Sequence, residues 1–136
     1  MMHDENLALA QRAWEAVAAG DTEALQQVWA PNIVWHVTGM NPWTGAHVGH
    51  AAVCDYLADV GEAGEAYDTR LDDLLVSKDR LVMVCHVTAR RGKRTVETDQ
   101  VLMARVEGGQ IAEVWTVPLN PSAFEGFWET AVAAGE

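Results

Sequence analysis

Residues 67–117 of this chain consist almost entirely of strand-like runs joined by very short turns. The runs lie at 67–76, 81–89, 95–106 and 111–117, and the turns between them lie at 77–80, 91–92 and 108–109. Runs rich in β-branched residues and bounded by turn-forming residues are typical of strands. Turns this short join only antiparallel neighbours, because a parallel pair needs a crossover of about a dozen residues or more. The chain is therefore restricted to an antiparallel meander, and one face of that sheet needs a cover.

The first half of the chain supplies helices for that cover. Apolar residues recur at helical spacing over 5–19, and Gly20 suits the C-terminal cap of this helix. A second helix is predicted over 21–29, with the aspartate at its start as the N-cap. The β-branched and aromatic run 33–37 predicts a strand, and the apolar stripe over 50–60 predicts a third helix.

Two further segments complete the predicted fold. The stretch 39–45 predicts a loop by its Gly and Pro content, and the capping box 122–125 opens a C-terminal helix. We predict one α+β domain over 1–136, a cone in which a curled, mostly antiparallel sheet packs on three helices, with the C-terminal helix added. Such a cone is easily open at one end, and this opening is a natural small-molecule pocket.

Composition limits the expected partners and location of the protein. The 136 residues carry a formal net charge of −11, so nucleic acid is not an expected partner, because phosphate binding needs a basic surface. No apolar stretch approaches the roughly 20 residues that a membrane helix requires. The N-terminus has no basic leader or apolar signal core, so we expect a cytoplasmic protein without a membrane partner. Cys54 and Cys85 lie among apolar neighbours and are expected to be buried free thiols.

Three segments, in this order, resemble one protein family. They are Ala19–Asp21 followed by Val28–Gly39, then Trp43–Gly45 with Gly49 beyond it, and finally Gly108–Trp115. By these segments the chain resembles the SnoaL-like branch of the NTF2-like, or ketosteroid isomerase-like, superfamily, and the resemblance spans nearly the whole chain. It implies the cone-shaped fold. It does not imply one activity, because the superfamily includes isomerases, polyketide cyclases, epoxide hydrolases, dehydratases and proteins without catalysis.

Several positions that carry chemistry in the family hold other residues here. Family enzymes tend to place an acid on the last strand, where this chain has Thr116. Ketosteroid isomerases place a carboxylate base at the end of the first strand, where it has Val37, and an oxyanion-donating tyrosine near Trp14. An indole donates one hydrogen bond but cannot transfer a proton. The isomerase machinery is therefore not intact, and we predict Trp14, Gln100 and Thr116 as ligand contacts in the pocket.

His36 is the predicted catalytic residue. It lies in the first predicted strand, close to the following loop. A histidine side chain exchanges protons near neutral pH, which suits a general base. In epoxide-hydrolase-like relatives the corresponding polar position faces the cavity. The alternative is that His36 is a hydrogen-bonded packing residue of the strand, and the sequence leaves both interpretations open.

A second histidine belongs to a predicted polar group. If Arg91-Gly92 forms the turn, then His86 pairs with Glu97 and shares a face with Asp99. If this face lines the cavity, His86 is a pocket residue and a base oriented by a carboxylate. If the face points outward, the group belongs to a solvated or dimer surface. The family resemblance turns Gln100 inward and so favours the outward interpretation.

The aromatic and remaining histidine residues give weaker signals. Trp43, in the predicted loop, is expected to cover a pocket mouth or an interface, and Trp115 to belong to the core or the cavity wall. A zinc site from His36, His47 and His50 is not expected, because the spacing is loose and no acid completes it. No phosphate loop or dinucleotide fingerprint is present, and we predict no metal or cofactor.

Three functions remain open from the sequence. The first is a cofactor-free isomerase, cyclase or hydratase that acts on a small, largely apolar carbonyl or hydroxyl compound, with His36 as the base. The second is a non-catalytic binding protein with the same pocket, and the third is a dimerisation module. A homodimer through the convex sheet face is expected, because both faces of 81–89 are substantially apolar and an apolar outer face should not remain in water.

Overall fold

The computed structural model of the chain describes residues 2–38, 43–63 and 66–120. The helices of this part are α1 (Met2–Ala19), α2 (Thr22–Val28) and α3 (His50–Ala63). The strands are β1 (Trp29–Val37), β2 (Gly45–Val48), β3 (Ala66–Val76), β4 (Arg80–Arg91), β5 (Arg94–Glu107) and β6 (Gln110–Pro118). None of the described helices has the length and apolar character that a membrane span needs.

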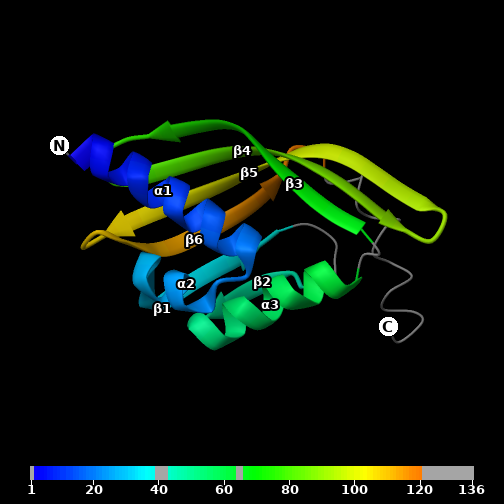
Figure 1. Ribbon diagram of the computed structural model, residues 1–136, viewed down its shortest axis with the longest axis horizontal. Helices are drawn as coiled ribbons and strands as arrows, with labels where there is room; N and C mark the ends of the chain where they lie inside the picture. Colours follow the sequence, from blue (N-terminus) through cyan, green and yellow to red (C-terminus); the bar gives the residue numbers. More distant parts are fainter. Residues whose placement is uncertain (1, 39–42, 64–65, 121–136) are drawn as a thin grey trace.

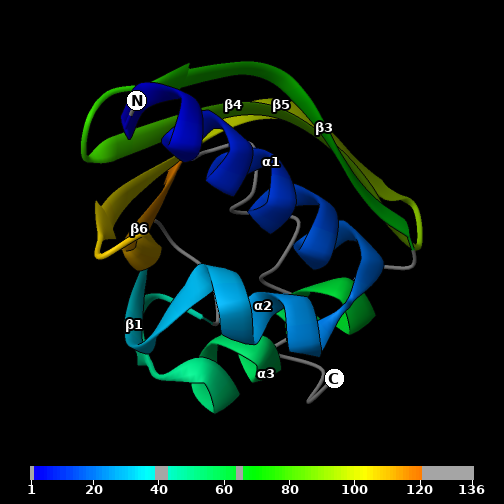
Figure 2. The same cartoon turned by 60° about the vertical axis from the view of Figure 1, so that its left-hand side comes forward.

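All the strands join one sheet in the order β2-β1-β6-β5-β4-β3. Every neighbouring pair is antiparallel except β1 and β6, which run parallel. The sheet curls, and Figure 1 shows α1 lying across it while α2 and α3 lie on the side of β1. Figure 2 shows the curved strands arching over α1. The predicted architecture, a curled and mostly antiparallel sheet with helices on its concave side, is therefore confirmed.

The short strand β2 was not predicted. It pairs with β1 from Val34 opposite Val48 to Val37 opposite Gly45, where the sequence analysis placed only the end of a loop. Gly45 and Gly49 bound this run and have φ values of 129° and 90°. Glycines at both ends of a run of a few residues are typical of a loop, so the sequence pattern did not predict this strand. Residues 39–42 of the predicted loop and the predicted C-terminal helix from Ser122 lie outside the described residues.

The junction between α1 and α2 forms as predicted. Gly20 has a φ of 66°, and its amide donates to the carbonyl of Val17 at 3.2 Å. The next amide, that of Asp21, donates to Ala16 at 3.0 Å, which completes a Schellman cap. The Asp21 side chain then accepts from the amide of Ala24 and begins α2. Two caps within two residues therefore set the angle at which the helices meet.

The hairpin between β4 and β5 differs from the predicted pairing. Gly92 takes the first of the two central turn positions with a φ of 62°, so Arg91 pairs with Arg94. A hairpin turn of type II′ requires this backbone conformation at its first central position, where glycine is favoured. The predicted pairing had placed the glycine second. As a result His86 lies opposite Asp99 rather than opposite the predicted partner.

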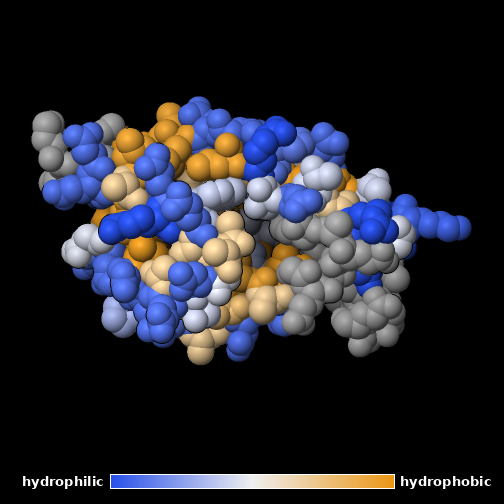
Figure 3. Space-filling model, in the orientation of Figure 1, coloured by the Kyte–Doolittle hydropathy of each residue, from blue (hydrophilic) through white to orange (hydrophobic). Residues whose placement is uncertain are grey.

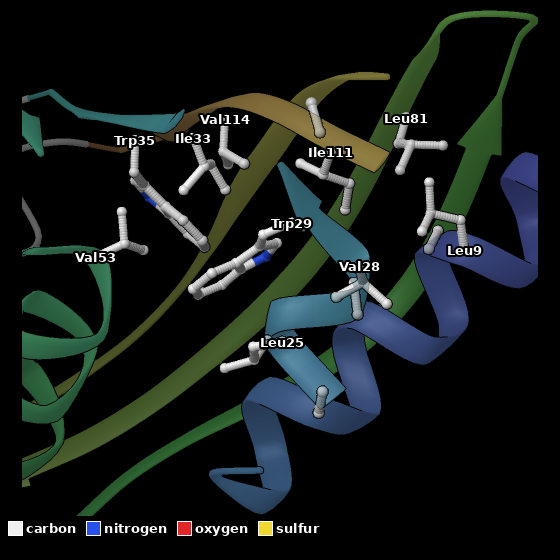
Figure 4. Packing of buried hydrophobic residues seen from close by; sticks show 14 of the residues in the cluster. Leu9, Leu25, Val28, Trp29, Ile33, Trp35, Val53, Leu81, Ile111 and Val114 are labelled. Atoms are coloured by element: carbon white, nitrogen blue, oxygen red, sulfur yellow. The ribbon is translucent and has the colours of Figure 1, made fainter. Parts of the chain in front are cut away.

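The core lies between β1, β6 and the helices. Trp29, Ile33 and Trp35 of β1 are at most 5% exposed, and the two indole rings meet edge to face with 5.9 Å between centroids. Figure 4 shows these side chains with Val53 of α3 and Ile111 of β6 around them. Because strand side chains alternate between faces, burying this set turns the residues between them to the convex side.

Candidate functional site

A cavity of about 430 Å³ opens between α1, α3 and the concave face of the sheet. Figure 3 shows a hollow near the middle of this face of the molecule. Apolar side chains make up much of its wall, among them Trp14, Val17, Leu57, Val60, Met83 and Leu102. Small-molecule sites have volumes of roughly 300–1,000 Å³ and walls of this kind. The volume and the lining therefore suit a ligand of a few fused or linked rings.

A few polar side chains interrupt the apolar wall. Gln100 of β5 and Thr116 of β6 are 9% and 8% exposed and face the cavity from neighbouring strands. Trp14 borders the same space from α1. The structure thus places Trp14, Gln100 and Thr116 around one cavity, while their roles as ligand contacts stay predictions.

Tyr56 of α3 is a wall residue that the sequence analysis missed. It is 8% exposed, and its ring stacks on His47 with 4.8 Å between centroids. Burial raises the pKa of Tyr56 to about 12, although a hydrogen bond between Tyr56 and Thr116 acts in the opposite direction. The signal was present, because a tyrosine in an apolar helical stripe carries a hydroxyl that needs a partner. By pattern alone it belongs to the apolar stripe that predicts the helix over 50–60.

The indole of Trp35 joins this polar group. Its Nε1–H donates to Oγ1 of Thr116 at 2.7 Å, and its ring lies 6.0 Å from that of Tyr56. All three side chains are buried and line the cavity from different elements, β1, β6 and α3. An apolar cavity with a single polar focus orients a ligand through that focus.

The two cysteines are free, as predicted. Cys85 is buried in β4 and lies on the cavity wall, where burial raises the pKa of its thiol to about 12. Cys54 of α3 is only half-buried, and burial again raises its pKa. The thiolate is the reactive form of cysteine, so the Cys85 thiol is inert at neutral pH.

His36 does not lie on the cavity wall, and its predicted position is wrong. Its neighbours Trp35 and Val37 are buried on the concave face, so strand alternation turns His36 to the convex face. There its ring stacks on Trp115 with 5.4 Å between centroids, and its Nε2 lies 2.6 Å from Oε2 of Glu113. This contact is the largest of the influences that lower the pKa of Glu113. His36 is therefore on the wrong side of the sheet to act as a base in this cavity.

His86 also faces outward, so its assignment as a pocket residue is wrong. The alternation of β4 buries Cys85 and Val87 on the concave face and leaves His86 on the convex one. Its Nδ1 lies 2.8 Å from Asp99 and its Nε2 3.0 Å from Glu97. The predicted polar group does form, in the outward alternative that the sequence left open.

The other predicted aromatic and histidine positions are also resolved. Trp115 stacks on the convex face and Trp43 packs against the core cluster beside Tyr56, so neither is among the described residues of the cavity wall. His47 contacts the backbone carbonyl of Trp43, and His50 contacts the ring of Trp29. His36, on the opposite face, does not join them in a metal site.

Among the described residues, one group of side chains has donor atoms close enough to share a metal ion. Atoms of Asp72, His86 and Asp99 lie within 4.8 Å of one another on the convex face. However, Arg70 donates from Nε to Oδ1 of Asp72 at 2.6 Å, so a guanidinium already neutralises that carboxylate. Both ring nitrogens of His86 also contact carboxylates. The arrangement is an ion-pair network, and we assign no metal to it.

This network predicts a pH dependence of stability. Hydrogen bonds to Asp99 and then Glu97 raise the pKa of His86 above its ordinary 6.5. The contribution of His86 is therefore complete below about pH 6.5 and is lost as the pH rises through the higher folded-state pKa. We expect His86→Gln to flatten the decline in the urea midpoint between about pH 6 and pH 8.5. Wild type and variant with the same decline would contradict the network's role.

Comparisons with known proteins show which protein family and which solved structures this chain is similar to. The profile of the SnoaL-like domain matches residues 10–114. An uncharacterized protein of Mycobacterium tuberculosis is 29% identical over 130 residues, which cover 94% of this chain and 99% of that protein. Bal32a, from a soil-derived mobile gene cassette, is similar with a TM-score of 0.88 at 21% identity, over 95% of this chain and 100% of its own. TerC, co-crystallized with polyporic acid, has a TM-score of 0.80 at 17% identity, over 92% and 98%.

Proposed function

The chain belongs to the SnoaL-like domain family, and on this premise we propose that its cavity binds a small, largely apolar molecule with a carbonyl or hydroxyl group. The observation that carries this proposal is the cavity of about 430 Å³ with an apolar wall and one polar focus. The wall supplies affinity by removing apolar ligand surface from water, and the focus supplies orientation. TerC, which shares the fold, was co-crystallized with polyporic acid, and this supports the same use of the fold here.

The polar focus favours a neutral ligand. Gln100 and Thr116 carry no charge, and Tyr56 keeps its proton because burial raises its pKa to about 12. Asp68 is the carboxylate among the described lining residues, and it is exposed to solvent. An ionised ligand would lose hydration against this wall without gaining a buried opposite charge from the described residues.

Binding without chemistry is the function that the described wall supports best. Proton transfer near neutral pH needs a group that exchanges its proton there. Tyr56 and Cys85 both have pKa values of about 12, and His36 lies on the other face of the sheet. A cofactor-free isomerase, cyclase or hydratase is the second candidate. It is favoured by Asp68, a wall residue whose carboxylate can accept a proton as a general base.

Filling the cavity tests the proposal. Leu102 of β5 is a half-buried wall residue, so Leu102→Trp should place an indole in the ligand's space. We expect neutral ring compounds, 1-tetralone among them, to raise the melting temperature of the wild type by several degrees at saturating concentration and to leave this variant unchanged. A thermal-shift titration measures both.

Gln26→Trp is the matched control for this experiment. It introduces the same side chain at an exposed position of α2, away from the cavity wall and from the convex face. The control should respond to the ligand as the wild type does. A wild type that responds to no neutral ring compound, or a Leu102→Trp variant that responds equally, would end the proposal.

We also propose that the protein forms a homodimer through the convex face of the sheet. Trp115, Met103, Val82 and Leu75 lie opposite one another on β6, β5, β4 and β3 and form an apolar row. A second row beside it consists of Val117, Val101 and Val84. Leu75, Val117 and Met103 are 53%, 40% and 36% exposed in the single chain. A twofold axis would pack this convex face against the same face of a second copy of the protein, and both faces would be removed from water.

A further inference from the structure

We infer that the buried amide of Gln100 selects a ligand with a hydrogen-bond donor beside an acceptor, so that the preferred ligand is a cyclic amide, or lactam, with an apolar body. This inference rests on the proposed function, because it names the ligand class of the same cavity. It depends on the burial of Gln100, on the lack of a partner for its amide among the described residues, and on the chemistry of the wall around it.

Gln100 is a buried polar side chain of the cavity wall. It is 9% exposed on the concave face of β5, which lies between β4 and β6 in the sheet. Among the described residues, none donates a hydrogen bond to its amide or accepts one from it. In the same part of the chain, every fully enclosed side-chain nitrogen or oxygen has a partner, so the unpaired amide atoms of Gln100 must reach the free space of the cavity. A buried amide without a protein partner is uncommon, and a ligand is one explanation for it.

The immediate neighbours of Gln100 do not act as this partner. Cys85 lies opposite it on β4, but its thiol donates to a backbone carbonyl of its own strand at 3.6 Å. Pro118 lies opposite it on β6 and has no amide hydrogen to donate. Thr116, also on β6, is already the acceptor for the indole of Trp35 at 2.7 Å. The Gln100 amide therefore keeps its donors and its acceptor for a molecule in the cavity.

A primary amide offers an N–H and a carbonyl oxygen side by side, whichever way the group is turned. A partner with the complementary pair forms two parallel hydrogen bonds with it, as glutamine does with the edge of adenine. A lactam has its N–H and its carbonyl on adjacent atoms, and the ring holds them on the same side. A simple ketone engages only the N–H and leaves the Gln100 oxygen buried without a partner, which is costly. A ligand that displaces water from this amide must replace both hydrogen bonds, and a lactam does so.

Three probes with one ring skeleton test the inference. They are 3,4-dihydro-2(1H)-quinolinone, 2-tetralone and tetralin, which carry an N–H beside a carbonyl, a carbonyl alone, and neither group. Isothermal titration calorimetry gives their dissociation constants, and tetralin measures the affinity that the apolar wall supplies by itself. We expect the wild type to bind the lactam at least about fivefold more tightly than the ketone, because the lactam makes the second hydrogen bond.

Gln100→Met removes the amide and keeps an unbranched side chain of similar length. The lactam should then lose at least about tenfold in affinity, because its N–H and carbonyl would lie unpaired against an apolar wall. The ratio between lactam and ketone should fall to about one or below. Gln26→Met is the matched control, because it makes the same exchange at an exposed position of α2 and should leave the ratio unchanged.

Thermal unfolding of the free protein separates a binding role of Gln100 from a structural one. An amide that is kept for a ligand contributes no internal hydrogen bond, so Gln100→Met should unfold at the same temperature as the wild type or at a higher one. An amide that is bonded within the protein would instead make the variant lose several degrees or fail to fold. Either of those results would overturn the inference.

The binding outcomes separate this inference from the proposed function. If the wild type binds none of the three probes, the proposed function itself fails. If it binds all three with equal affinity, the cavity takes apolar ligands and only the inference is overturned. Thr116→Val should keep the preference for the lactam. If the preference disappears in Thr116→Val and survives in Gln100→Met, the lactam is recognised at Thr116, and the inference is again overturned.

Discussion

Trp29→Ala is expected to destabilise the protein by about 3–5 kcal/mol, the largest effect of any single truncation that we predict. Trp29 is 1% exposed at the point where α2 passes into β1. Its ring meets Trp35 edge to face at 5.9 Å and lies 5.6 Å from the ring of His50. Truncation leaves a cavity between two helices and the sheet, and the surrounding main chain can close it only in part. Urea unfolding measures the change.

Trp14→Ala is the matched control for this prediction. Trp14 also lines the cavity, as Trp29 does, but it lies on α1 and is only half-buried, so its truncation removes fewer packed neighbours. We expect a loss of about 1–2 kcal/mol there. A typical domain is stable by about 5–15 kcal/mol, so Trp29→Ala should still fold in the absence of urea. The prediction is wrong if both variants lose the same free energy.

Met103→Glu is expected to convert the proposed dimer into a monomer. Met103 lies at the middle of the apolar row, between Trp115 and Val82 on the neighbouring strands. Near a twofold axis each copy would bring one carboxylate into the interface, where it would lose hydration and meet a like charge. We expect the dimer to weaken at least about 100-fold, which is about 2.8 kcal/mol. Sedimentation velocity at micromolar concentration distinguishes the two states.

Gln26→Glu supplies the control, because it adds the same charge on an exposed position of α2, away from the convex face. This variant should sediment as the wild type does. Far-ultraviolet circular dichroism should show that Met103→Glu retains its secondary structure. A wild type that is monomeric at about 10 µM, or a Met103→Glu variant that remains dimeric, would exclude this face as the interface.

The element order was predictable because it depends on local signals. Period-two and period-3.6 patterns, Gly20 after the first helix and Asp21 before the second all act within a few residues. The strand β2 was missed because a short run between two glycines has no local pattern strong enough to distinguish it from a loop. It becomes a strand only because the edge of β1 is available to pair with it.

The faces of the strands were harder to predict than their positions. Alternation shows that His36 and Trp35 lie on opposite faces, but it does not say which face is concave. The burial of Trp35 against the helices decides this, and it places the predicted base outside. At the hairpin, one residue decided the register, because Gly92 must occupy the first central turn position.

The sequence alone determined that the strands of 67–117 form an antiparallel meander covered by helices, and it predicted Trp14, Gln100 and Thr116 as neighbours in one pocket. Both conclusions rest on periodicity, turn length and resemblance to a family. Neighbouring residues or aligned segments are enough to show these signals. Only the tertiary structure decided that Tyr56 and Trp35 complete the polar focus and that His36 and His86 do not. The reason is that a hydrogen bond between residues 81 positions apart, such as that from Trp35 to Thr116, depends on sheet curvature and strand order, and no local pattern encodes either.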